Sequence, residues 1–170
     1  MRNLEIKAVA DELGAVRATL RALGGARLHA TLRQADHYFS VPTGRLKLRV
    51  VGGSRSGELI AYLRPNRASA RTSEFQRLPS ADAAGTKRLL DRMLGAKGCV
   101  RKRREVWLYK NARIHLDTVE GLGRFIEIEV VVAKGMPQAS ALMRKLRAVL
   151  GIKPEALVAG SYGEMSGERR

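Results

Sequence analysis

The sequence predicts a mainly β protein of the α+β class, a closed eight-stranded antiparallel barrel with about three helices packed outside. Three observations lead to this prediction. About eight segments have the composition or the polar–apolar alternation of strands. Most of them are separated only by short, turn-like stretches, as in hairpins. Three further segments carry apolar residues at helical spacing, which suits helices that cover the outside of a barrel.

The first half of the chain predicts a strand, a helix and four more strands. Residues 3–7 alternate polar and apolar side chains, as in a strand. Residues 9–23 then place Val9, Leu13 and Leu20 at helical spacing, and Gly24-Gly25 end this predicted helix. The expected strands that follow cover residues 27–41, 45–51, 58–64 and 71–78.

The second half predicts a helix, three strands and a closing helix. Ser80 or Asp82 caps a helix over residues 81–95, which stops at Gly95. Strands are expected at 99–109, 112–119 and 123–133. Pro137 lies in the first turn of the next helix, 136–150, and a shorter helix is expected after Pro154.

The composition indicates one domain, which we expect over residues 1–165, with a frayed tail at 166–170. The chain has no long apolar run and no signal-peptide pattern, so we expect a cytoplasmic protein without a membrane partner. Cys99 is the single cysteine, which excludes an internal disulfide and fits a reducing compartment.

The net charge of +16 is the strongest compositional signal. Such an excess indicates a polyanionic partner: nucleic acid, an acidic membrane surface or a phosphate-rich small molecule. The position of the charges along the predicted strands decides between these classes.

Several predicted strands carry charged or polar residues on one parity and aliphatic residues on the other. The polar sets are Asn3, Glu5 and Lys7; Arg45, Lys47 and Arg49; Arg113, His115 and Asp117; and Glu127 and Glu129. One such strand is typical of a sheet whose polar face meets solvent. Because amphipathic helices are available to cover an apolar exterior, the repeated pattern favours charged faces that converge on a lumen.

Converging charges need compensation. An anion would compensate Lys47, Arg49 and Arg64, and a cation would compensate the carboxylates. Mg²⁺ or Mn²⁺ binds carboxylate oxygens together with substrate phosphates. The pattern therefore predicts a triphosphate or inorganic polyphosphate ligand with a divalent metal.

The segments that carry these residues resemble the CYTH family, the class IV adenylate cyclase and thiamine triphosphatase group of the triphosphate tunnel metalloenzymes. The matching stretches are Asn3–Ala8, Gln34–Phe39, Gly44–Arg49, Leu63–Pro65, Lys102–Arg104, Arg113–Asp117 and Phe125–Glu129, and they span nearly the whole chain. The resemblance implies an eight-stranded antiparallel tunnel and metal-dependent chemistry on triphosphates.

The resemblance also implies roles for individual residues. Glu5, Glu127 and Glu129 correspond to metal ligands, and with Asp117 they form the expected catalytic set. The expected phosphate-binding cations are Lys7, Arg45, Lys47, Arg49, Arg64, Lys102, Arg104 and Arg113. Gln34, Asp36 and Tyr38 either line the tunnel or support it by hydrogen bonds, and His115 is either a base or a supporting partner.

The chain departs from the family signature at its start. The signature is Glu-x-Glu-x-Lys, and here Asn3 stands in place of the first Glu. An amide oxygen can still bind a metal, but one negative charge is lost. This weakens the prediction of two tightly held metals. The prediction of ligand binding is therefore stronger than the prediction of catalysis.

These observations leave several functions open. The leading one is a triphosphatase. A class IV-type adenylate cyclase that makes cyclic AMP from ATP is an alternative, and so is a non-catalytic polyphosphate-binding protein. A nucleic-acid module using the cations at 101–104 is not favoured, because the predicted strands lack interleaved aromatic residues. A monomer and a homodimer both fit.

Overall fold

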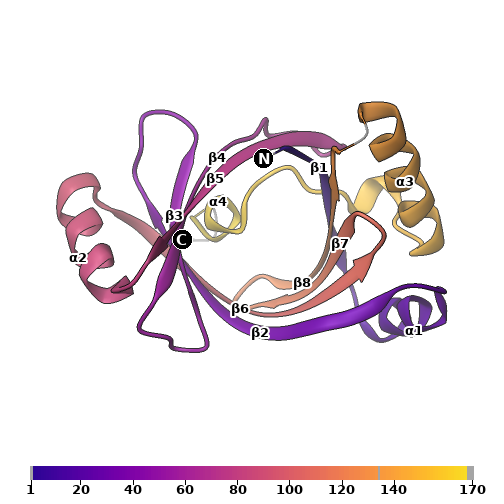
Figure 1. Ribbon diagram of the computed structural model, residues 1–170, viewed down its shortest axis with the longest axis horizontal. Helices are drawn as coiled ribbons and strands as arrows, with labels where there is room; N and C mark the ends of the chain where they lie inside the picture. Colours follow the sequence, from indigo (N-terminus) through magenta and orange to yellow (C-terminus); the bar gives the residue numbers. More distant parts are fainter. Residues whose placement is uncertain (1, 134, 168–170) are drawn as a thin grey trace.

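The structure is a computed structural model that describes residues 2–133 and 135–167. Eight antiparallel strands of this part of the chain close into a barrel in the order β1-β5-β4-β3-β2-β6-β7-β8 (Figure 1). The strands are β1 Arg2–Ala10, β2 Arg27–Phe39, β3 Arg45–Val51, β4 Gly57–Leu63, β5 Arg71–Ser80, β6 Ala96–Tyr109, β7 Ala112–Val119 and β8 Gly123–Val131. The predicted fold class is confirmed.

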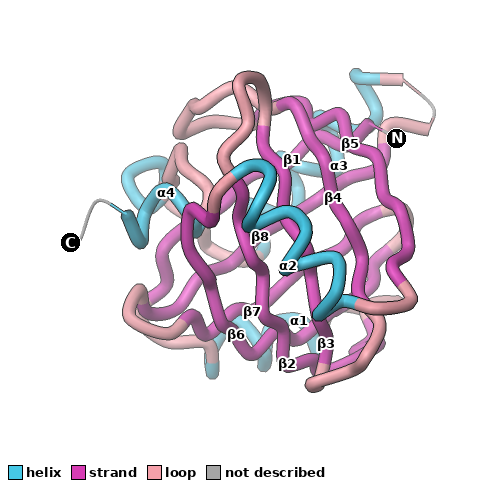
Figure 2. The backbone as a smooth tube through the Cα atoms, turned by 90° about the vertical axis from the view of Figure 1, so that its left-hand side faces the viewer, coloured by secondary structure: helices cyan, strands magenta, loops and turns pink. Residues whose placement is uncertain are grey.

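The helices are α1 Gly14–Ala22, α2 Ala83–Leu94, α3 Met136–Val149 and α4 Tyr162–Gly167, with a 3-10 turn, η1, at Pro154–Ala156. In Figure 1, α1 and α3 lie on one side of the barrel and α2 lies on the other. Figure 2 shows α2 lying across the outside of the strands. Among the described residues, no helix is long and apolar enough to cross a membrane.

The apolar parity of the strands faces the helices and forms the core. Ile6 of β1 and Ile128 of β8 are fully buried in the cluster that also contains Leu20 of α1 and Leu146 of α3. On the opposite side, Leu48 of β3 packs in a cluster with residues of α2. Burying one such side chain contributes about 1.5–3 kcal/mol, so this packing holds the apolar faces outward. The charged parity is thereby left facing the lumen.

The short helix α4 packs against one end of the barrel. The chain just after Pro154, where a shorter helix was expected, forms only the 3-10 turn η1, and α4 begins at Tyr162. The rings of Tyr162 and Phe125 meet edge to face, with centroids 5.0 Å apart, in a small cluster with Tyr38. In Figure 1, α4 lies inside the outline of the barrel. It includes Ser166 and Gly167, the first two residues of the expected frayed tail, whereas 168–170 lie outside the described residues.

Several boundaries differ from those predicted, and the first helix differs most. Residues 9 and 10, expected in that helix, belong to β1, because the β1–β8 ladder continues to the pair Ala10–Arg124. The helix therefore begins only at Gly14. Similarly, β6 starts at Ala96 rather than at 99, because Ala96 pairs with Phe39 of β2. Strand pairing overrides the local periodicity in both places.

Candidate functional site

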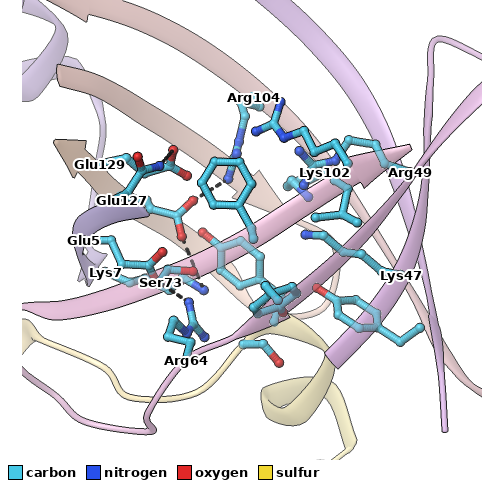
Figure 3. Close-up of a pocket in the computed structure, with 18 residues that line it drawn as sticks. Glu5, Lys7, Lys47, Arg49, Arg64, Ser73, Lys102, Arg104, Glu127 and Glu129 are labelled. Atoms are coloured by element: carbon cyan, nitrogen blue, oxygen red, sulfur yellow. Dashed lines mark hydrogen bonds and ion pairs between the residues drawn. The ribbon is translucent and has the colours of Figure 1, made fainter. Parts of the chain in front are cut away.

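The inward parity of the strands lines a cavity inside the barrel. It encloses about 630 Å³ of atom-free space, including space open to solvent. Figure 3 shows the carboxylates gathered on one side of the cavity, with Lys7 and Arg64 beside them, and the cations Lys47, Arg49 and Lys102 on the other side. We call Glu5, Glu127 and Glu129 the acidic side, and Lys47, Arg49 and Lys102 the basic side.

The basic side is organised around a single buried carboxylate, Asp36 of β2. The Nζ atoms of Lys47 and Lys102 lie 3.1 and 2.6 Å from Asp36 Oδ2. Arg49 donates to both oxygens, at 2.7 and 2.9 Å. Although burial alone raises it, these three cations hold the pKa of Asp36 well below its usual range. Asp36 thus has the supporting role that the sequence left open.

The basic side still carries excess positive charge, because one carboxylate faces three cations. Burial, reinforced by the nearby Arg49 guanidinium, lowers the pKa of Lys47 to about 7. Burial likewise lowers the pKa of Lys102 to about 8. An anion placed between these side chains would stabilise their charged forms. The arrangement is that of a preformed anion site.

The acidic side contains a group of atoms that could hold a metal ion. Ligand atoms of His115, Glu127 and Glu129 all lie within 4.8 Å of one another. His115 Nδ1 is 3.3 Å from a carboxylate oxygen of Glu127 and 3.9 Å from one of Glu129. Carboxylate oxygens and an imidazole nitrogen suit a divalent ion such as Mn²⁺. The residues therefore fit the metal dependence of the family that the sequence resembles, although Glu5 is not in this group.

A buried network of hydrogen bonds holds Glu127 of the acidic side in place. Arg104 donates to Glu127 at 2.8 Å and to both oxygens of Asp117, at 2.7 and 2.5 Å. The hydroxyl of Tyr162 donates to Asp117 at 2.8 Å. Asp117 is fully buried and does not line the cavity. In this structure it positions Arg104.

Asn3, at the departure from the signature, does line the cavity. Its Nδ2 donates to Glu129 Oε2 at 3.2 Å. The same oxygen accepts from Arg113 Nη2 at 2.8 Å. The amide thus holds a carboxylate that a Glu at this position would repel.

Glu5 faces two arginines rather than the other carboxylates. Its Oε1 lies 2.5 Å from Arg64 Nη1 and 3.4 Å from Arg71 Nε. Burial, and then the negative charge of Glu127, raise the pKa of Glu5, whereas Arg64 opposes the rise. Lys7, its neighbour on the same face, lies 3.9 Å from Glu127, and burial lowers its pKa to about 8.

The structure brings together most of the residues expected in the site. Those that line the cavity are Glu5, Lys7, Lys47, Arg49, Arg64, Lys102, Arg104, Glu127 and Glu129. Arg45, Arg113 and Asp117 do not line it. Arg45 is instead bound by Glu164 of α4, at 2.8 Å. The roles of all these residues remain predictions.

The sequence interpretation missed several lining residues: Ile60, Tyr62, Ser73, Phe75, Arg77, Ser161 and Tyr162. Parity could have found some of them, since Ile60 and Tyr62 share a face with the predicted Arg64, and Ser73, Phe75 and Arg77 alternate along β5. Ser161 and Tyr162 come from the C-terminal segment, which no strand pattern marks. The aromatic residues of the lining form what we call the aromatic wall of the cavity: Tyr38, Tyr62, Phe75 and Tyr162.

Comparisons with known proteins agree with this architecture. A family model for the CYTH domain matches residues 1–162. The PH1012 protein from Pyrococcus horikoshii OT3 superposes with a TM-score of 0.85 at 22% identity, covering 95% of this chain and 98% of that one. A putative adenylate cyclase from Vibrio parahaemolyticus superposes with a TM-score of 0.75 at 16% identity, covering 97% of each chain.

A conserved hypothetical protein from Pyrococcus furiosus gives a TM-score of 0.84 at 22% identity, with 95% and 98% of the two chains covered. At these identities the superpositions show a shared fold. No curated protein matches the chain significantly.

Proposed function

This chain belongs to the CYTH domain family, and we propose that it is a metal-dependent triphosphatase that hydrolyses a phosphoanhydride bond of a triphosphate or polyphosphate. One observation carries the proposal: the three cations of the basic side line the same cavity as Glu127 and Glu129, two of the three residues that could hold a metal ion (Figure 3). Mg²⁺ and Mn²⁺ are the ions that combine such carboxylates with phosphate oxygens.

The basic side would bind and orient the phosphate chain. Arg49 binds Asp36 through Nε and Nη2 and would contact a phosphate through its remaining Nη1, and Lys47 and Lys102 add point charges. Because Asp36 fixes all three side chains before the ligand arrives, binding loses little side-chain freedom. Catalysis would then rest largely on positioning and charge neutralisation.

The metal would be held by Glu127 and Glu129 of the acidic side together with His115. A divalent ion held by these residues would supply charge neutralisation at phosphate oxygens and would lower the pKa of a bound water. Arg104 bridges Glu127 and Asp117, and this keeps the Glu127 carboxylate directed into the cavity. Glu129 is held in the same way by Asn3 and Arg113.

The aromatic wall favours a second candidate function, a class IV-type adenylate cyclase. Tyr38, Tyr62 and Phe75 line the cavity. Aromatic side chains provide stacking surfaces for a nucleobase. A nucleoside held there could direct its 3′-hydroxyl at the α-phosphorus of ATP.

Product analysis separates these functions. The purified protein is incubated with tripolyphosphate, ATP or thiamine triphosphate, each with Mg²⁺ or Mn²⁺, and phosphate, pyrophosphate and cyclic AMP are measured. We expect phosphate release that is lost in Glu127→Gln. Cyclic AMP with pyrophosphate from ATP would establish the cyclase instead. Tight binding without turnover of any substrate would establish a non-catalytic binder.

A further inference from the structure

Arg64 and Arg71 form a buried pair of cations that shares a single carboxylate oxygen. Arg64 follows β4 and Arg71 begins β5, and their side chains are 4% and 1% exposed. Both contact Oε1 of Glu5, Arg64 at 2.5 Å and Arg71 at 3.4 Å. One carboxylate therefore faces two guanidinium groups, and one positive charge is left uncompensated at this place.

The two guanidinium groups are also short of acceptors. Among the described residues, Nε and Nη2 of Arg64 have no hydrogen-bond partner, and the same is true of Nε and Nη2 of Arg71. By contrast, Arg49 and Arg104 each use Nε and Nη2 to bind both oxygens of one aspartate. Leaving a buried cation poorly paired is costly, so a bound anion would stabilise this cluster.

Arg71 is held in place independently of Glu5. Its Nη1 donates to the carbonyl oxygens of Arg67, at 2.5 Å, and Val158, at 3.0 Å. These backbone contacts fix the guanidinium and leave its buried Nε–Nη2 edge without a hydrogen-bond acceptor in the described part of the chain, although Arg71 itself does not line the cavity. That edge has the geometry that binds two oxygens of a phosphate or carboxylate. The cluster is thus arranged for an anion with more oxygens than Glu5 provides.

We propose that Arg64 and Arg71 form a phosphate-binding subsite that the Glu5 carboxylate occupies while no phosphate is bound. The inference rests on the proposed function and adds Arg71, which the family resemblance did not mark, to the ligand-binding residues. A phosphate group displaces Glu5 and engages the free edges of both arginines. Glu5 lies between Arg64 and Glu127 in Figure 3. A phosphate chain that spans the basic side and this subsite should bind more tightly as it lengthens.

Isothermal titration calorimetry with phosphate, pyrophosphate and tripolyphosphate, in buffer containing EDTA, tests the subsite without metal or turnover. Glu5→Gln should tighten tripolyphosphate binding by about tenfold or more, because the competing charge is gone. Glu129→Gln removes the same charge from the same cavity and should tighten binding by less than about threefold. Equal tightening in the two variants would show a general charge effect and would overturn the proposal.

Variants of Arg71 provide a second, independent test. Arg71→Met should weaken tripolyphosphate binding by about tenfold while changing phosphate binding by less than about threefold, since one phosphate can use the basic side alone. Because Arg71 also ties down two carbonyl groups, Arg71→Lys is measured beside it and thermal unfolding checks both variants. Unchanged tripolyphosphate affinity in a folded Arg71 variant would contradict the subsite.

The outcomes separate this proposal from the proposed function. Selective tightening in Glu5→Gln together with a wild-type protein that turns over no substrate would support the subsite and reject hydrolysis. Turnover by the wild type, together with identical responses of Glu5→Gln and Glu129→Gln, would support hydrolysis and reject the subsite.

Discussion

The basic and acidic sides of the lumen balance their charges in different ways. On the basic side, three cations hold Asp36 through contacts of 2.6 to 3.1 Å, so every cation is fixed. On the acidic side, several contacts are long: 3.9 Å from Lys7 to Glu127, 3.4 Å from Arg71 to Glu5 and 3.3 Å from His115 to Glu127. The two sides therefore differ in arrangement: one carboxylate gathers three cations on the basic side, whereas on the acidic side each carboxylate has its own arginine at 2.5 to 2.8 Å beside longer contacts.

The largest expected effect is on the free energy of unfolding when the basic side loses its carboxylate. Asp36→Asn leaves three cations facing one another in a buried place, and we expect a loss of about 3–5 kcal/mol. Denaturant titration measures this loss, and added tripolyphosphate should restore part of it by replacing the lost charge. Asp91→Asn, which breaks a surface pair with Lys87, is the control and should cost less than about 0.5 kcal/mol. A loss below about 1 kcal/mol in Asp36→Asn would contradict the rigid basic side.

Steady-state kinetics should separate the two sides by their effect on kcat and KM. Lys47→Met removes a cation that binds phosphate before and during reaction, so most of its effect should be a higher KM. Glu127→Gln removes a proposed metal ligand and should lower kcat by about 100-fold or more. An effect of Lys47→Met confined to kcat would show that the basic side acts only in the transition state.

His115 tests how the acidic side holds its metal. His115→Ala should weaken Mn²⁺ binding by about tenfold, measured by calorimetry without substrate, because one of three proposed ligands is lost. His29→Ala, on the exposed part of β2, is the matched control and should leave the affinity unchanged. Unchanged affinity in His115→Ala would leave the carboxylates as the metal site.

The smallest expected effect is the pH dependence of the basic side. The pKa of Lys47 is lowered to about 7 and that of Lys102 to about 8, so both lose protons as pH rises through 7–8. Tripolyphosphate affinity should then fall by about threefold to tenfold per pH unit, with proton uptake on binding. Calorimetry in buffers of different ionisation enthalpy measures this uptake, and Lys47→Met should reduce it.

The same two lysines make the free energy of unfolding rise with pH, whereas ligand affinity falls. Their unfolded-state pKa is near 10.5, so between about pH 7 and 10 the unfolded chain binds more protons than the folded one. The free energy of unfolding contributed by Lys47 and Lys102 therefore rises with pH over this window in the ligand-free protein. Denaturant titrations at pH 7 and pH 9, with Lys47→Met as the comparison, measure it. A contribution that does not change between pH 7 and pH 9 would show that these lysines stay charged when buried.

The sequence was enough to predict the barrel and most of the cavity lining. Side-chain alternation within a strand is a local property, so the parity of Lys47 and Arg49, or of Glu127 and Glu129, follows directly from their spacing. Amphipathic helices supplied the reason for turning these faces inward. The boundaries of β1 and β6 were less predictable, because pairing with distant strands extended them beyond their local patterns.

Only the tertiary structure decided which charged groups meet. That Asp36 gathers the basic side, that Glu5 faces Arg64 and Arg71, and that His115 joins Glu127 and Glu129 all depend on how the strands close around the lumen. The same holds for Tyr162, which reaches Asp117 from a helix 45 residues further along the chain. The charged-lumen barrel was thus determined by local alternation and helix amphipathicity, whereas its two chemically different sides arise from long-range register, which no single segment encodes.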